Sequence, residues 1–428
     1  MNVMILGLGQ YPNGSGMAAA VYFAKQKNVK VTVYDFYYSK AMDANVTKLK
    51  KFENVKFVLG IHKLDEIEKS DLIVKHQRLR EDEPEVQEAK KLGKALDSEL
   101  SIFFKACPCP IVGITGTRGK STTTTMIYDI LSASKEWRKV WLGGNILISP
   151  LTFLDKMKAE DIVVLEMSSF QLESTGAAGL SPQIAVYTNI FRDHLNAYPS
   201  MVEYAEAKAQ IFRHQKPEDV VFFPNTKDFN AYAKEAPGIA LRVKNQQLNL
   251  SVPGEHNQMN ASFAAAVAEE LGVKKTVIQG VLKSFKGLPY RQEFAGMKSG
   301  VTIINDSTST MPDATIVALK SLKGPVHVLI GGNDKELEFG ELAKVIKKLK
   351  PKVYLMPGNA EKKILESFEK AKIGFSAFES WTDAVNAAHS EAKKGETILF
   401  SPGCTSFGEF ANEFDRGEKF NKLVKKWK

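Results

Sequence analysis

The sequence is poor in the features that mark secreted, membrane-spanning and repeat proteins. It has three cysteines in 428 residues, too few for a disulfide framework. Two of them, Cys107 and Cys109, lack the second pair that a zinc site needs, so we expect free thiols. No stretch approaches the roughly 18 apolar residues of a membrane span. The opening MNVMILGLG has no basic region or cleavage site, which predicts a cytoplasmic protein without membrane insertion.

Repeats and low-complexity segments are also missing, which excludes a solenoid. The length exceeds the size at which a single core stops growing, so we expect two or three domains. The net charge of +9 suits nucleic acid, an anionic surface or a polyanionic small substrate. The lysines, however, are spread over helical faces such as 344–352, without an RNA-binding aromatic signature or a zinc-finger pattern. We therefore expect small-molecule substrates, no nucleic acid and a monomer.

The most informative stretch is 111–125, IVGITGTRGKSTTTT, in which an apolar run meets a glycine-rich loop and a helix start. Glycines allow backbone N–H groups to close around phosphate oxygens, and the helix N-terminus attracts the same anions. Lys120 would contact the terminal phosphates of ATP, and the hydroxyl of Ser121 or Thr122 would bind Mg²⁺. The spacing departs from the common phosphate loop, whose first glycine would fall at Ile114.

Residues 1–107 have the pattern of a first α/β domain, with strands predicted at 3–6, 30–34 and 71–74 and a helix at 17–27. This order is typical of dinucleotide binding with Asp35 on a ribose, but Pro12 stands where the third glycine belongs. The loop 10–16 instead indicates another phosphate-bearing ligand. The basic run 75–80 fits either a solvated loop or a pyrophosphate contact.

The second predicted domain, 108–288, places polar groups after its strands. A strand at 161–166 ends in Glu166, the segment after the strand 184–187 contains His194, and a helix at 201–212 carries Lys208. A single histidine or lysine is usually structural or solvated. Three such groups beside a phosphate loop, at the strand ends where α/β proteins gather ligands, indicate a functional site.

The third predicted domain, 289–428, has strands at 302–305, 326–330, 353–356 and 397–400 with helices between them. This alternation predicts a doubly wound, parallel sheet. The fold class is therefore α/β with three domains: a Rossmann-like N-terminal domain, a central phosphate-loop domain with a mostly parallel sheet, and a Rossmann-like C-terminal domain.

Motifs along nearly the whole chain resemble those of the Mur ligase family. They are GITGTRGKSTTT, GGNILISP, VLEMSSFQLE, DHLNAYPSMVEYAEAK, GEHNQMNASFAAA, GLPYR, INDSTSTMPDAT, LIGGNDK and LFSPGCTSFGEFANEFDRG. The resemblance implies ATP-dependent amide-bond formation through an acyl phosphate, with the three domains binding a UDP-linked substrate, ATP and an amino acid. SSFQLE and NDS-x-x-T favour the branch that adds D-glutamate to UDP-N-acetylmuramoyl-L-alanine for peptidoglycan.

The resemblance also assigns the catalytic and metal-binding groups. Lys120 would hold the γ-phosphate, Ser121 and Glu166 one Mg²⁺, and His194 and Lys208 a second Mg²⁺. A lysine ammonium cannot bind a cation, so the resemblance implies that Lys208 is carbamylated. The predicted catalytic residues are Lys120, Asn145, Glu166, His194 and Lys208, with Asn145 near the reacting carboxylate.

The remaining implied contacts fall into four groups. Those to ATP are Gly116, Thr117, Arg118, Gly119, Lys120, Ser121, Thr122, Asn257, Asn260, Arg291 and Asp306. Those to the UDP substrate are Gly9, Gly14, Asp35, Asn145 and Ser168. Those to the amino acid are Thr310, Lys335, Ser406 and Phe414. Departures from the family pattern are Thr308 in place of lysine and Glu413 at an aromatic position, which Phe414 would take over.

Two alternatives stay open at this point. The chain could be a Mur-type ligase acting on another amino acid or another carboxylate. It could also be a non-catalytic, ATP-binding regulatory protein that retained the loop. The presence of Glu166, His194 and Lys208 argues against the second alternative, because binding alone does not require three metal-site groups.

Overall fold

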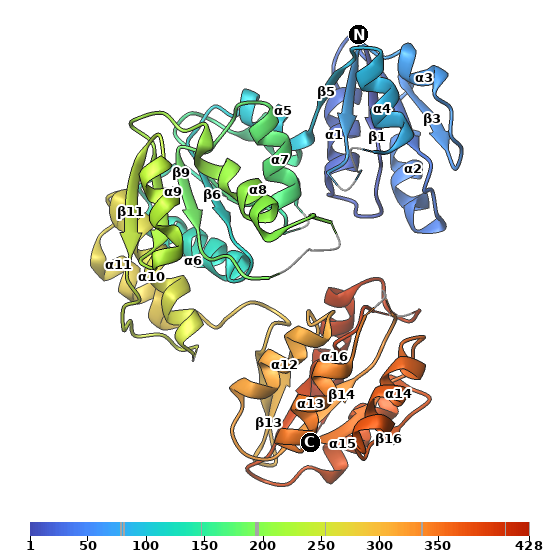
Figure 1. The fold of residues 1–428 in the computed structure, drawn as a ribbon, viewed down its shortest axis with the longest axis vertical. Coiled ribbons are helices and arrows are strands. Elements are labelled where there is room, and N and C mark those ends of the chain that lie inside the picture. Colours follow the sequence, from blue (N-terminus) through green and yellow to red (C-terminus); the bar gives the residue numbers. More distant parts are fainter. Residues whose placement is uncertain are drawn as a thin grey trace. The chain divides into compact units, whose positions relative to one another are not determined.

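The computed structural model describes residues 1–77, 79, 82–146, 148–192, 197–252, 254–334, 337–406 and 408–427. Its strands form three sheets, one of five and two of six strands. The chain divides into two compact units, Met1–Phe285 and Lys286–Lys428, and the first unit contains two of the sheets (Figure 1). The predicted α/β class is confirmed. The predicted domain boundaries after 107 and 288 stay predictions.

The first sheet is entirely parallel, in the order β3-β2-β1-β4-β5. Its strands are β1 (Asn2–Leu6), β2 (Lys30–Asp35), β3 (Val55–Leu59), β4 (Leu72–Lys75) and β5 (Ala95–Asp97). The helices that follow them are α1 (Ser15–Ala24), α2 (Asp43–Leu49), α3 (Asp65–Glu68), α4 (Pro84–Lys91) and α5 (Glu99–Ala106). Parallel strands need such helical crossovers, which cover the faces of the sheet.

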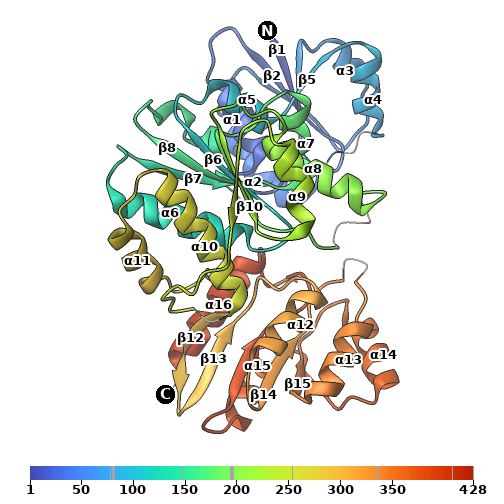
Figure 2. The same cartoon turned by 60° about the vertical axis from the view of Figure 1, so that its left-hand side comes forward.

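The central sheet is also parallel, in the order β11-β10-β9-β6-β8-β7. Its strands are β6 (Ile111–Thr115), β7 (Val140–Gly144), β8 (Ile162–Glu166), β9 (Ile184–Tyr187), β10 (Val220–Pro224) and β11 (Ile239–Val243). The helices are α6 (Lys120–Ser134), α7 (Ser169–Ala177), α8 (Met201–Arg213), α9 (Asn230–Glu235), α10 (Glu255–Glu270) and α11 (Lys275–Ser284). Figure 2 shows α6, α10 and α11 side by side, as their contacts require. All residues of β6, β8, β9 and β10 are buried, which explains their continuous apolar sequences.

One apolar core runs through both sheets of the first unit, with buried side chains from Val3 to Phe229. Helices α1 and α5 pack against the short helix η2 (Pro150–Thr152), and α5 also packs against α7. The backbone N–H of Ser149 donates a hydrogen bond to the carbonyl of Asn13 at 2.8 Å. The loop before α1 is thereby attached to the segment that follows β7.

The sheet of the second unit has the order β12-β13-β17-β14-β15-β16. Its strands are β12 (Glu293–Lys298), β13 (Val301–Asn305), β14 (Val326–Ile330), β15 (Lys352–Leu355), β16 (Ser376–Ala377) and β17 (Thr397–Phe400). The helices are α12 (Pro312–Ser321), α13 (Gly340–Leu349), α14 (Glu361–Ala371), α15 (Trp381–Glu391) and α16 (Glu413–Lys426). The edge strand β12 pairs antiparallel with β13, so this sheet is mixed and not purely parallel as the strand pattern had predicted.

Alternate side chains of these strands serve two separate cores. Val328 and Leu399 join the core that contains α12, α13 and α14. Leu329 and Phe400, one residue further along the same strands, join the core that contains α15 and α16. This period of two is the geometry of an extended strand covered on both faces.

Two expectations from composition can be compared with the structure. Cys107, Cys109 and Cys404 are free thiols, as predicted. Within the described ranges, no helix is long and apolar enough to cross a bilayer.

Because both cores of the second unit consist of its own residues, we expect a fragment of residues 286–428 to fold alone. It should unfold cooperatively, with an enthalpy of roughly 100 kcal/mol near 60 °C for a chain of this size. Differential scanning calorimetry and circular dichroism would measure this. A fragment without a cooperative transition would show that its stability requires the rest of the chain.

Candidate functional site

The phosphate loop, residues 116–119, is closely enclosed by other parts of the central domain. Gly116 and Gly119 have φ angles of 144° and 79°, a region that favours glycine. A Cβ atom on Gly116 would lie 2.0 Å from Thr188 Oγ1, and one on Gly119 would lie 2.3 Å from Asn260 Oδ1. Both distances are too short for real atoms, so the loop fits between the end of β9 and α10 only with glycine at these positions.

Two residues after β9 determine the shape of the loop. The Thr188 hydroxyl donates to the carbonyl of Arg118 at 2.8 Å. The Arg118 N–H donates to Asn189 Oδ1, and Asn189 Nδ2 donates back to the Arg118 carbonyl, both at 2.9 Å. Sequence analysis did not identify Thr188 and Asn189. Their position directly after a buried strand was the available signal.

The predicted phosphate-binding lysine lies over this loop. Lys120 Nζ donates to the carbonyls of Gly116 at 3.0 Å and Thr117 at 3.1 Å. Ser121 and Thr122 follow in the first turn of α6. Asn260 is 5% exposed and accepts a hydrogen bond from the Thr123 hydroxyl at 3.3 Å. The structure thus brings the predicted loop residues and Asn260 together, with half-buried Asn257 one turn earlier on α10.

A carboxylate without a full set of partners lies at the end of β8. Glu166 is 3% exposed, and its Oε1 accepts a hydrogen bond from Asn145 Nδ2 at 2.9 Å. In the described part of the chain, its buried Oε2 has no hydrogen-bond partner. An unpaired buried acceptor costs about 1–3 kcal/mol, and more when it is charged. This oxygen is therefore suited to a cation that the protein alone does not supply.

The neighbouring strand fixes Asn145 beside Glu166. Gly144 pairs with Glu166 across the sheet, and the Asn145 N–H donates to the Glu166 carbonyl at 2.8 Å. A Cβ on Gly144, whose φ is 97°, would lie 2.1 Å from that same carbonyl oxygen. The absence of a side chain at Gly144 therefore allows β7 to approach β8 closely enough for the Asn145–Glu166 contact.

Lys208 is 2% exposed on α8, so it is not a solvated lysine. Its Nζ lies 4.7 Å from the centre of the Tyr204 ring, one turn earlier. The Tyr204 hydroxyl in turn donates to Thr117 Oγ1 of the phosphate loop at 3.4 Å. This face of α8 is therefore directed at the ATP side of the domain.

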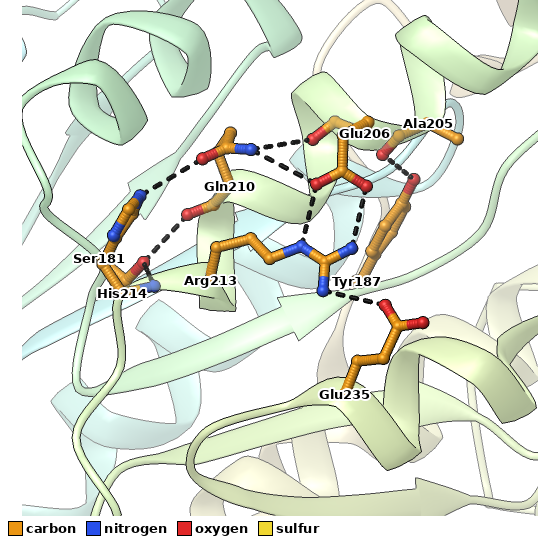
Figure 3. A network of polar contacts seen from close by, with 8 residues as sticks. All are labelled: Ser181, Tyr187, Ala205, Glu206, Gln210, Arg213, His214 and Glu235. Atoms are coloured by element: carbon orange, nitrogen blue, oxygen red, sulfur yellow. Dashed lines mark hydrogen bonds and ion pairs between the residues drawn. The ribbon is translucent and has the colours of Figure 1, made fainter.

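Another face of α8 is fixed by a polar network, shown in Figure 3. Arg213 donates two hydrogen bonds of 2.8 Å to Glu206 and one of 2.9 Å to Glu235. From β9, the Tyr187 hydroxyl donates to the carbonyl of Ala205 at 3.2 Å. The Arg213–Glu235 bond joins α8 to α9 and the Tyr187–Ala205 bond joins it to β9, so these two contacts restrain the helix that carries Lys208.

A cavity of about 440 Å³ lies between the first and second sheets. Gly9, Gly14, Asp35 and Asn145, four of the five residues predicted to contact the UDP substrate, line it. The carboxylate of Asp35 accepts hydrogen bonds from the N–H groups of Leu8 at 2.8 Å and Tyr37 at 3.0 Å. Asp35 thereby holds the glycine loop that ends β1.

The fifth residue, Ser168, is not part of the cavity lining. It forms a capping box at the start of α7, where its hydroxyl accepts from the Gln171 N–H at 3.2 Å. Residues that sequence analysis missed also line the cavity: His76, Glu99, Ser149 and Gln171. Gln171 belongs to the SSFQLE motif and His76 to the basic run, so the sequence could have identified both. For Glu99 and Ser149 the sequence offered only their places near strand ends.

In the second unit, Asp306 organises the loop after β13. It is 2% exposed and accepts from the Ser401 hydroxyl at 2.7 Å and the Gln292 N–H at 3.0 Å. Burial raises the pKa of Asp306 above its usual value, although these hydrogen bonds act in the opposite direction. Arg291, predicted to reach ATP, is exposed.

Three of the predicted amino-acid contacts lie among the described residues, Thr310 after β13, Ser406 after β17 and Phe414 in the first turn of α16. Thr310 and Ser406 are half-buried, and Phe414 is 40% exposed, with its ring edge-on to Tyr290 at 6.4 Å. Thr308, which replaces the family's lysine, donates its hydroxyl to the Tyr290 carbonyl at 2.9 Å.

Two predicted site residues, His194 and Lys335, lie outside the described residues, as do Arg78 and Arg80 of the basic run. Among the residues that are described, no group of three or more His, Cys, Asp or Glu side chains could hold a metal ion. Ser121 and phosphate oxygens are suitable further ligands for a metal at Glu166, because Mg²⁺ prefers oxygen.

Comparison with protein families gives two matches. The Mur ligase middle domain matches residues 114–242, and the glutamate ligase domain of Mur ligases matches residues 290–404. Among curated proteins, the UDP-N-acetylmuramoylalanine–D-glutamate ligase of Borreliella afzelii is 32% identical, over 99% of this chain and 97% of the relative. The ligase of the same name from Buchnera aphidicola is 34% identical over the same shares.

Solved structures show the same fold at lower identity. The UDP-N-acetylmuramate–alanine ligase MurC of Thermotoga maritima has a TM-score of 0.61 at 20% identity and covers 99% of both chains. The MurF ligase of the same organism, solved in complex with ADP, has a TM-score of 0.60 at 20% identity, with 94% of this chain and 97% of that chain covered.

We expect Lys120→Ala to reduce turnover by roughly 10²–10³-fold, the usual cost of losing one group that stabilises transition-state charge. Because Lys120 is half-buried in the first turn of α6 and donates to loop carbonyls, the fold should be retained. Phosphate release and circular dichroism measure both effects, with the exposed Lys158→Ala as a matched control. Turnover like that of the unchanged protein would exclude the phosphate-loop assignment.

Proposed function

Because the chain belongs to the Mur ligase family, with relatives about a third identical over nearly its whole length, we propose that it is an ATP-dependent amide-bond ligase. It joins D-glutamate to UDP-N-acetylmuramoyl-L-alanine in the synthesis of peptidoglycan precursors. The products are the D-glutamate-extended nucleotide sugar, ADP and phosphate. We further propose a monomer that works in the cytoplasm, where ATP is available.

The observation that carries this proposal is the phosphate loop beside a buried carboxylate with one unpaired oxygen. Lys120 lies over the loop, and Glu166 Oε2 has no partner in the described chain. The carboxylate of the L-alanyl substrate attacks the γ-phosphorus of ATP, and ADP leaves, which forms an acyl phosphate. The amine of D-glutamate then attacks the acyl carbon and phosphate leaves. The first step brings two anions together, so cations must neutralise them and hold them in line.

The residues at the loop suit a Mg²⁺ ion. Glu166 Oε2 offers a hard, anionic oxygen, and Ser121 in the first turn of α6 offers a hydroxyl. When bound there, Mg²⁺ would neutralise phosphate charge and act as a Lewis acid. Asn145, which donates to Glu166 Oε1, would keep the carboxylate oriented with its other oxygen toward the metal.

We propose a second Mg²⁺ site that uses a carbamate on Lys208 and His194. Support comes from the burial of Lys208, because an ammonium is costly to remove from water whereas a neutral amine is less so. A neutral amine can take up CO₂ and become an anionic oxygen ligand. The bonds that join α8 to α9 through Arg213 and Glu235, and to β9 through Tyr187, would hold this ligand in place.

The amino acid would bind to the second unit. D-Glutamate carries two carboxylates, which call for cations and hydroxyl donors. Thr310, Ser406 and Lys335 are the proposed donors, with Phe414 in place of the family's aromatic residue. Thr308 stands where the family usually has a lysine, and its hydroxyl donates to the Tyr290 carbonyl. Lys335 is therefore the cation proposed to bind a carboxylate of D-glutamate.

We expect Lys208→Ala to lose about 10²-fold or more in phosphate release that depends on ATP, D-glutamate and UDP-N-acetylmuramoyl-L-alanine together. Added short-chain carboxylates should restore part of it, because they replace the missing anion at the metal. Lys208→Arg, which keeps a cation but cannot form a carbamate, is the matched control and should not be rescued. Mass measurement of the native protein in bicarbonate and Mg²⁺ that finds an unmodified Lys208 would exclude the carbamate.

A further inference from the structure

Glu99 occupies an unusual place for a carboxylate. It is the first residue of α5, is 5% exposed, and lines the cavity between the first two sheets. Its Oε1 accepts a hydrogen bond from the Ser149 hydroxyl. The Ser149 oxygen itself accepts from the Leu151 N–H at 3.3 Å, so the serine proton is directed at Glu99. Within the described ranges, this hydroxyl is the one side chain that hydrogen-bonds to Glu99.

The described surroundings of Glu99 contain no cation paired with it. Among the described residues, none forms an ion pair with it, although Lys25 on the neighbouring α1 pairs with Asp155 at 3.5 Å. On α7, Glu173 accepts from the Tyr198 hydroxyl at 3.0 Å. The ionisable groups that share the cavity lining with Glu99 are Tyr11, Asp35, Tyr37, His76 and Glu83. Two of them are carboxylic acids, which disfavour a further negative charge.

Burial raises the pKa of Glu99 to about 7, with the Ser149 hydrogen bond acting in the opposite direction. The helix N-terminus also favours the anion, so burial is the dominant effect. Burial therefore places the pKa of Glu99 close to neutral pH.

The proposed substrate changes this balance. A UDP-linked sugar carries a diphosphate, and the cavity lining includes the glycine loop at the start of α1, where an anion is favoured. An ionised Glu99 in the same cavity would repel the diphosphate. A protonated Glu99 would not, and its O–H group would be a hydrogen-bond donor.

We propose that Glu99 is a positioning residue that holds a proton whenever the nucleotide sugar is bound, and that its neutral carboxyl donates a hydrogen bond to an anionic oxygen of that substrate. Binding thus takes up a proton from solution at Glu99. No covalent bond forms or breaks in the substrate. The inference rests on the proposed function, because it requires a diphosphate in this cavity.

Isothermal titration calorimetry of UDP-N-acetylmuramoyl-L-alanine into the full-length protein, without ATP or Mg²⁺, tests this inference. Repeating the titration in buffers of different ionisation enthalpy gives the number of protons taken up. Glu99 should contribute about half a proton near pH 7, close to one near pH 8.5 and close to none near pH 5.5. Because His76 lines the same cavity, the decisive quantity is the difference in proton uptake between the unchanged protein and Glu99→Gln.

Glu99→Gln keeps an N–H donor but cannot take up a proton. It should therefore bind the substrate without the proton uptake that Glu99 contributes. The matched control Glu83→Gln, on a half-buried residue of the same lining, should keep it. A second variant, Ser149→Ala, loses the hydrogen bond that favours ionised Glu99, so its uptake profile should shift to higher pH. It also provides the test if Glu99→Gln does not fold.

The outcomes separate the two proposals. Equal proton uptake in the unchanged protein and Glu99→Gln, or an unshifted profile in Ser149→Ala, would overturn the inference alone. A folded, unchanged protein that does not bind the nucleotide sugar would overturn the proposed function and the inference with it. If Glu99 had only a structural role, Glu99→Gln would lower the stability of the protein or its affinity for the substrate, but the number of protons taken up on binding would not change.

Discussion

The fit of the phosphate loop between β9 and α10 is the constraint on which the central domain depends. Gly116 and Gly119 have no room for a side chain, because Thr188 and Asn260 occupy that space. These partners come from segments about 70 and 140 residues away in the chain. The loop can therefore take its shape only when the parallel sheet and its helices are complete, which couples ATP binding to the fold of the whole domain.

Buried ionisable groups mark the places where small molecules are expected to complete the structure. Among the described residues, one oxygen of Glu166 has no hydrogen-bond partner, Lys208 is almost fully buried, and the side chain that bonds to Glu99 is a serine hydroxyl. Burying a charged group costs stability unless partners replace its lost water. In the proposed function, a cation at Glu166, CO₂ at Lys208 and a proton at Glu99 would offset this cost.

Much of the fold was predictable because its buried strands are continuous apolar runs. The predicted strands 184–187, 326–330 and 397–400 coincide with β9, β14 and β17. Strands at edges were missed, since β12 alternates half-buried and exposed residues and β16 has only two residues. Motifs located Lys120 and Glu166. The contact of Thr188 with Arg118 and that of Glu99 with Ser149, however, join segments that are distant in the sequence. Such pairs follow from packing, which no local pattern contains. Ser168 caps helix α7. A sequence motif does not distinguish a serine that caps a helix from a serine that binds a substrate.

The most direct measurement is a competition assay for the amino acid that is added. The full-length protein would be incubated with ATP, Mg²⁺, UDP-N-acetylmuramoyl-L-alanine and an equimolar mixture of D-glutamate, L-alanine, L-lysine and diaminopimelate, and the products identified by mass. An acidic amino acid with two carboxylates should be selected, so the nucleotide-sugar product should carry D-glutamate, with one phosphate released for each amide bond formed. A product that carries a neutral or diamino acid, or phosphate release without any amide product, would contradict the assignment.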